Sequence, residues 1–187
     1  MKIGSHNSWS FLKPSSLWMW PFLFMAKCQS RSIRGQLDRG ASLFDLRFYP
    51  LSDNEFEIRH GLMRYKSKNI DSDLKLLSGY WVRLILEQPK KSKEQNTIDE
   101  RFVALSNALI KKFPAVKFFG FYRKFDWKKL KDEVHSEVPV LVDMYSSVKS
   151  PKYLDDWCPF LYSWLNKKKI QEMKEKDTSG WLFIDFV

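Results

Sequence analysis

Seven ionisable side chains stand at or near the ends of apolar stretches in this sequence. They are His6, Asp45, Arg47, His60, Glu87, Asp143 and Asp185. The carboxyl ends of parallel strands meet at one edge of a sheet, and enzymes with barrel folds assemble their active sites there. The alternative for Asp45, Arg47 and His60 is a surface hairpin that carries only a salt bridge.

Two histidines and one arginine suit the cleavage of a phosphodiester by an internal hydroxyl group. One imidazole accepts the proton of the attacking hydroxyl, and the other donates a proton to the leaving oxygen. A guanidinium neutralises charge on the phosphoryl oxygens, and a carboxylate behind the basic histidine fixes its tautomer. Metal ligation is the rival use, but His6 and His60 lack a ligand spacing and Arg47 would repel a divalent cation. We therefore expect no metal site.

Residues 43–61 are expected to position three of these groups. Apolar and polar residues alternate at both ends of this segment. The intervening stretch Pro50-Leu-Ser-Asp-Asn54 is turn-forming, so a hairpin or two neighbouring strands are predicted.

The remaining elements predict the fold class. Residues 3–8 are expected to be the end of a strand that opens into a loop, with further strands at residues 81–87, 116–122, 138–145 and 180–187. Helices are expected at 27–39, 69–77, 97–112, 126–134, 150–165 and 167–176. This alternation predicts an α/β fold with a largely parallel sheet. Polar residues at successive strand ends favour a distorted or incomplete TIM-type (β/α) barrel, formed by residues 1–187 as a single domain. An open doubly wound sheet is the alternative, but no glycine-rich phosphate loop such as GxGxxG is present.

The composition indicates a folded, strongly basic protein. Hydrophobic residues make up 44% of the chain, which excludes disorder, and the net charge of +10 implies an anionic partner. Cys28 and Cys158 lack a metal-type spacing, so free thiols are expected. No apolar run is long enough to span a bilayer, and the chain starts without an export signal. We expect a soluble protein, peripheral on membranes, that is cytoplasmic or secreted by a route the sequence does not show.

Residues 17–25, LWMWPFLFM, are apolar all round and include Trp18, Trp20, Phe22 and Phe24. This segment is too short to span a bilayer, and Pro21 is expected to interrupt any helix. Composition leaves two interpretations. The segment is buried over the core, or it enters lipid at headgroup depth beside Lys13 and Lys27.

Four motifs, in order, carry a resemblance to a known family. They are Ile3-Gly-Ser-His-Asn-Ser8, Gln36-Leu-Asp-Arg-Gly40, Leu43-Phe-Asp-Leu-Arg47 and His60-Gly61. Together they resemble the catalytic X domain of phosphatidylinositol-specific phospholipase C. The thirteen-residue step from Arg47 to His60 and the final stretch Trp181-Leu-Phe-Ile-Asp-Phe186 look like the bacterial branch. The resemblance implies a PLC-like phosphodiesterase fold and an enzyme that cleaves inositol phospholipids to diacylglycerol and a cyclic inositol phosphate.

The resemblance also implies roles for individual residues. His6 would be the general base supported by Asp185, His60 the general acid, and Arg47 the phosphate contact with Asp45 beside it. The substrate-binding candidates are Asn7, Glu87, Asp143 and Tyr145. The resemblance further favours lipid contact by Trp18, Trp20, Phe22 and Phe24.

No cofactor is expected. Asn7 and Glu87 resemble calcium-dependent eukaryotic members of the family, but Arg47 stands where those enzymes carry a carboxylate. The guanidinium can take the place of the cation, so a metal-independent reaction is favoured over a calcium-dependent one.

The expected partner is an anionic phospholipid surface, and nucleic acid is not expected. Two alternatives stay open. Two histidines and an arginine on a basic, aromatic-rich chain also suit RNA cleavage. A non-catalytic lipid-binding module that keeps the fold is the other, because the chain is short and carries Asn7 where the bacterial enzymes have Asp.

Overall fold

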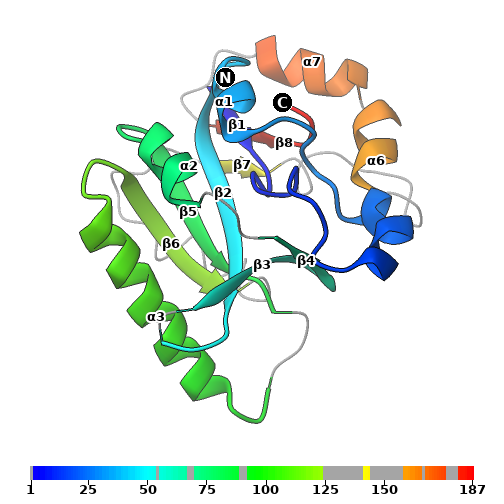
Figure 1. The fold of residues 1–187 in the computed structure, drawn as a ribbon. Coiled ribbons are helices and arrows are strands. Elements are labelled where there is room, and N and C mark those ends of the chain that lie inside the picture. The colour runs from blue at the N-terminus through cyan, green and yellow to red at the C-terminus, as the bar shows by residue number, and fades with distance from the viewer. Residues whose placement is uncertain are drawn as a thin grey trace.

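The computed structural model describes residues 2–53, 55–66, 70–88, 92–123, 141–143, 158–165, 167–175 and 181–187, and only the backbone of 119–123, 141–143, 161, 162 and 169 (Figure 1). Its strands are β1 (Lys2–Ser5), β2 (Ala41–Pro50), β3 (Phe56–His60), β4 (Met63–Tyr65), β5 (Trp81–Leu86), β6 (Lys117–Arg123), β7 (Leu141–Asp143) and β8 (Trp181–Ile184). Its helices are the 3-10 helix η1 (Leu17–Met25), α1 (Ile33–Leu37), α2 (Ile70–Leu76), α3 (Gln95–Lys112), α6 (Pro159–Leu165) and α7 (Lys167–Glu175).

The strands form one mixed sheet in which most neighbours are parallel. The parallel strands follow the order β7-β8-β1-β2-β5-β6, so the first strand of the chain pairs with the last. Within the described residues, β6 pairs only with β5 and β7 only with β8. The predicted α/β class with a largely parallel sheet is therefore confirmed.

The long strand β2 receives two different partners along one edge. β1 pairs with its first half, as far as Phe44, and β3 pairs antiparallel with its end from Phe48 onward. Its other edge is covered by β5 from Leu43 to Phe48. Between β1 and β3 the edge is therefore left to the loop that follows β1, whose Ser8 bonds the backbone of Asp45 in both directions. The active-site candidates lie at this opening.

Side chains of β2 alternate between two layers, as strand geometry requires. Phe48 packs outward in an aromatic cluster with Phe56 of β3 and Phe102 of α3, with ring centroids 5.0 and 4.8 Å away. Figure 1 shows the long helix α3 running beside β2 and β6. Asp45 and Arg47 have the opposite parity and face the inner layer, where Phe183 is buried against Leu43.

The structure confirms the hairpin predicted for residues 43–61 and changes several other details. β4, only three residues long, was not recognised as a strand because it is too short to show alternation. The helix expected at 27–39 is confined to α1, which Ser32 caps by accepting a hydrogen bond from Gly35 N. Helix α3 begins two residues before the capping box expected at 97–100.

The apolar segment η1 forms a 3-10 helix that contains Pro21. The expectation that Pro21 interrupts any helix here is therefore wrong. Within the part of the chain that the structure describes, no helix combines the length and apolar character needed to cross a bilayer.

We expect Phe48→Ala to lower the free energy of unfolding by about 3–5 kcal/mol, because it empties a fully buried aromatic site. Urea denaturation followed by circular dichroism measures this change. Leu51→Ala, at a half-exposed position three residues further on, is the control and should cost under about 0.5 kcal/mol. Equal effects of the two substitutions would show that the aromatic cluster does not stabilise the sheet.

Candidate active site

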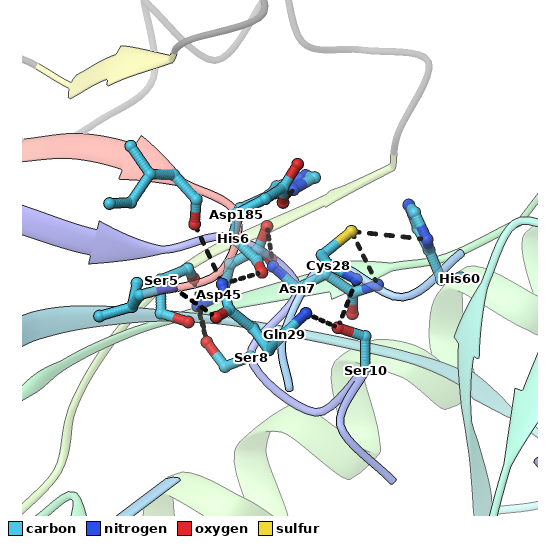
Figure 2. Close-up of polar contacts among 12 residues, drawn as sticks. Ser5, His6, Asn7, Ser8, Ser10, Cys28, Gln29, Asp45, His60 and Asp185 are labelled. Carbon is cyan, nitrogen blue, oxygen red and sulfur yellow. Dashed lines mark hydrogen bonds and ion pairs between the residues drawn. The ribbon is translucent and has the colours of Figure 1, made fainter. Parts of the chain in front are cut away.

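His6 and Asp185 come together because they follow two paired strands. β1 and β8 run parallel and in register up to Ser5 and Ile184, so the next residues share the carboxyl edge. His6 Nδ1 lies 2.7 Å from Asp185 Oδ1, and both side chains are buried (Figure 2). A carboxylate only accepts hydrogen bonds, so Nδ1 carries the proton and Nε2 is the basic nitrogen.

Arg47 lies at the centre of a buried charge network. Its Nη2 is 2.7 Å from both Asp45 Oδ2 and His6 Nε2, and its Nη1 is 3.3 Å from Glu87 Oε2. Burial opposes ionisation of Asp45, but the charges of Arg47 and Arg83 outweigh it and hold the pKa of this carboxyl well below its usual range. Burial likewise opposes the charge of Arg47, yet Asp45 and Glu87 raise its pKa above the usual value.

Arg83 is a second buried arginine that sequence reasoning missed. It stands directly opposite Asp45 in the β2–β5 register, and its Nη2 donates to Asp45 Oδ2 at 3.1 Å. Its guanidinium stacks on the ring of Phe183, 4.1 Å from the ring centroid. That ring packs closely on Gly4, where an added Cβ would lie 3.2 Å from it. The only sequence signal for Arg83 was its position as a charged residue inside an otherwise apolar strand, because strands buried on both faces are normally apolar throughout.

His60 ends β3 and faces His6 across the opening. The ring centroids are 6.1 Å apart, edge to face. His60 Nδ1 is 2.9 Å from the backbone oxygen of Ala26, so Nδ1 is the donor and Nε2 the other titratable position. Gly61 then turns the chain with φ +59°, and its N–H donates to Glu87 Oε1 at 2.8 Å. Glu87 thus joins the His60 turn to Arg47.

Asn7 and Cys28 lie between the two histidines (Figure 2). Asn7 has φ +45°, and its Nδ2 contacts Cys28 Sγ at 4.0 Å, while its buried Oδ1 has no hydrogen-bond partner within the described part of the chain. Cys28 Sγ also lies 3.9 Å from His60 Nδ1. Burial, followed by the charge of Asp185, raises the pKa of this thiol well above its usual value, so it stays protonated at neutral pH.

The closest cluster of possible metal ligands does not suit a calcium ion. Among the described residues, His6, Cys28 and Asp185 form the one group of at least three histidine, cysteine or acidic side chains whose ligand atoms lie close together, within 4.8 Å of one another. Calcium takes oxygen ligands, whereas this group supplies nitrogen and sulfur beside a single carboxylate. Arg47 contributes a positive charge 2.7 Å from His6.

The remaining predicted site residues are placed as follows. Asp143 ends β7 opposite Phe183, although its side chain is outside the described structure, and Tyr145 lies wholly outside the described residues. Trp18, Trp20, Phe22 and Phe24 of η1 are all exposed, and only Met19 of that helix is buried. The interpretation of this segment as a buried cap is therefore wrong for these four side chains.

We expect Arg83→Met to lower the free energy of unfolding at pH 7 by about 3 kcal/mol, because it removes a buried partner of Asp45. Asp45 has a depressed folded-state pKa, so it stabilises the fold above its unfolded pKa, and this contribution is lost as the pH falls through the folded value. Without Arg83 that pKa rises toward the unfolded value, so the variant has less of this stability to lose, and the difference between wild type and variant should shrink as the pH falls below the ordinary carboxyl pKa of 3.8. Denaturation curves between pH 2 and 7 measure both effects.

The control for Arg83→Met is Lys112→Met, which removes the solvent-exposed pair with Asp71. Its expected cost is under about 1 kcal/mol and should change little with pH. If the two variants behave alike, the Asp45 network does not stabilise the site.

Comparison with known proteins was made on sequence and on fold. No protein-family model and no curated protein matches this chain. Among solved structures, the F249X mutant of phosphatidylinositol-specific phospholipase C from Staphylococcus aureus aligns with 99% of this chain and 85% of that chain, at TM-score 0.60 and 16% identity. The phosphatidylinositol-specific phospholipase C from Listeria monocytogenes aligns with 99% of this chain and 87% of that chain, at TM-score 0.55 and 14% identity.

One further Staphylococcus aureus structure of this phospholipase aligns with 59% of this chain and 38% of that chain, at TM-score 0.43 and 23% identity. The two alignments that span nearly the whole chain carry the conclusion. This chain is similar in fold to the bacterial phosphatidylinositol-specific phospholipases C, as its sequence motifs predicted.

Proposed function

We propose that this chain is a phosphodiesterase that cleaves inositol phospholipids to diacylglycerol and a cyclic inositol phosphate. The observation that carries the proposal is the arrangement around His6. Its Nδ1 bonds Asp185, its Nε2 meets Arg47, and a second histidine lies 6.1 Å away. These are a base, an anion-binding cation and an acid within reach of one phosphoryl group.

The proposed reaction begins when the substrate phosphate binds Arg47. A phosphate oxygen competes for Nη2, which in the ligand-free site donates to His6 Nε2, and the basic nitrogen is thereby released. The ring hydroxyl next to the phosphodiester loses its proton to His6 Nε2 as its oxygen bonds to phosphorus. The bond from phosphorus to the glycerol oxygen breaks, and His60 Nε2 supplies the proton that this oxygen takes up. Asp185 stabilises the positive charge that His6 has gained.

Arg47 supports a reaction without a metal ion. Its planar fork can bind two phosphoryl oxygens, and Asp45 and Glu87 fix its position while Nη2 also donates to His6. A preorganised cation in a water-poor site stabilises the transition state strongly. The chain thus already has the positive charge that calcium would bring.

The finer architecture is part of the same proposal. The pairing of the first strand with the last, and the polar groups that directly follow β1, β5 and β8, support a distorted TIM-type barrel.

We also propose that η1 and α6 together form the membrane-contact surface. The two helices pack against each other, and Figure 1 shows the blue η1 directly beside the orange α6. On α6, Phe160 and Trp164 are 63% and 65% exposed, close to the 67% of Trp18. Exposed aromatic side chains at this density are typical of a membrane-binding surface. One structural neighbour, the phospholipase of Staphylococcus aureus, has been studied for its membrane binding.

Sequence reasoning missed the α6 part of this surface. Its aromatic residues are four positions apart, the spacing of a helix face that is usually buried. Lys13 near η1 and Lys167 and Lys168 at the start of α7 are exposed and add charge complementary to anionic lipid.

We expect His6→Ala and His60→Ala each to lower diacylglycerol release from phosphatidylinositol vesicles by about 10²–10⁴-fold, since each removes one proton-transfer group. Arg59→Gln is the control, because Arg59 lies on β3 next to His60 but pairs with Glu57. It should retain activity near the wild-type level. A wild-type protein that binds vesicles but hydrolyses none would leave only the lipid-binding module, and cyclic phosphate released from RNA alone would refute a lipid substrate.

We expect Trp18→Ala and Trp164→Ala each to weaken binding to phosphatidylinositol-containing vesicles roughly tenfold, because each large apolar side chain contributes at least about 1.5 kcal/mol when it leaves water. Vesicle sedimentation measures the binding. Val103→Ala, at a half-exposed position on α3, serves as the control and should leave binding unchanged. If Trp164→Ala also leaves binding unchanged, α6 is not part of the surface.

A further inference from the structure

The backbone oxygen of Ala26 links the end of the exposed helix η1 to the active site. Ala26 is the C-cap of η1. Its oxygen accepts hydrogen bonds from His60 Nδ1 at 2.9 Å and from the Tyr65 hydroxyl at 3.0 Å. A carbonyl oxygen has two lone pairs, so these two donors satisfy it. Cys28 Sγ adds a weaker contact at 3.7 Å.

The Tyr65 hydroxyl is a buried donor to the Ala26 oxygen that does not ionise near neutral pH. Tyr65 lies on β4, pairs with Ile58 of β3 and forms an isolated bridge with Pro14, and its side chain is 2% exposed. Burial raises the pKa of its hydroxyl far above the usual value, so the O–H stays protonated. The hydroxyl therefore ties the end of η1 to the sheet.

The same carbonyl decides which nitrogen of His60 carries the proton. A carbonyl cannot donate, so the imidazole must donate through Nδ1, and the proton transferred in catalysis must sit on Nε2. If the peptide after Ala26 turned away, His60 would lose both its tautomer and its ring orientation. η1 is mostly exposed, although Met19 and Leu23 pack against the core.

We propose that Tyr65 is a positioning residue for His60 and acts through the carbonyl of Ala26. Tyr65 fixes the carbonyl, the carbonyl fixes the imidazole, and the outward-facing helix η1 belongs to the same hydrogen-bonded unit. This inference rests on the proposed role of His60 as the general acid. No part of it requires Tyr65 to touch the substrate.

The test is the tautomer of His60, read from the ring-nitrogen chemical shifts in NMR spectra of ¹⁵N-labelled protein. The chain has three histidines, so the signals can be assigned by comparison with His60→Gln. In the wild type, neutral His60 should be the Nδ1–H tautomer. In Tyr65→Phe the population should move toward Nε2–H, while Tyr49→Phe, which removes a hydroxyl from the neighbouring strand β2, should leave the spectrum unchanged.

Activity provides the second readout. Tyr65→Phe should lower kcat on phosphatidylinositol vesicles roughly tenfold and leave KM unchanged. It removes the buried hydrogen bond from Tyr65 to Ala26 and no contact with the substrate. An Nε2–H tautomer in the wild type, or an unaltered His60 spectrum in folded Tyr65→Phe, would overturn the inference. Absence of phosphatidylinositol hydrolysis by the wild type would instead refute the phosphodiesterase proposal, and the NMR result would still decide what Tyr65 does to His60.

Discussion

The site depends on one buried ion pair, between Arg47 and Asp45. Neither charge would be stable alone in the interior. Arg47 lowers the pKa of Asp45 and Asp45 raises the pKa of Arg47, so both side chains stay ionised. Arg83 also donates to Asp45 and adds a second positive charge beside this carboxylate. Glu87 accepts a hydrogen bond from Nη1 of Arg47 and is its second carboxylate partner. The result is a guanidinium held by two carboxylates, whose Nη2 also donates to His6 Nε2. The rest of the site is arranged around this guanidinium.

The fold explains why these groups meet although they are far apart in the chain. β2 changes partner along one edge, from β1 to β3, and the loop of His6 to Ser8 enters the opening between them. The last strand of the chain pairs with the first and delivers Asp185 to His6. The hairpin returns His60 from the other side, and the Gly61 N–H bonds Glu87. Ladder pairing therefore sets the geometry, and side-chain charge then stabilises it.

Much of this could be predicted from the sequence, because it follows from strand patterns with polar ends. The hairpin, the α/β class and the proximity of His6, Asp45, Arg47, His60 and Asp185 belong to that part. Arg83 could not be identified in the same way, since its partner is set by the register between β2 and β5, which a single sequence does not reveal. The carbonyl of Ala26 carries no side-chain signal at all. The exposure of Phe160 and Trp164 was hidden for a different reason, because an aromatic helix face is normally a buried one.

The central claim is that Arg47 takes the place of a metal cation in the cleavage of a phosphodiester by a hydroxyl group of the same substrate. Phosphorus-31 NMR of phosphatidylinositol vesicles incubated with the wild-type protein and a calcium chelator tests it most directly. The account predicts that the resonance of a five-membered cyclic phosphate diester grows at the expense of the lipid phosphodiester despite the chelator. A reaction that stops with the chelator and resumes with calcium would contradict it, as would direct formation of an acyclic phosphate monoester.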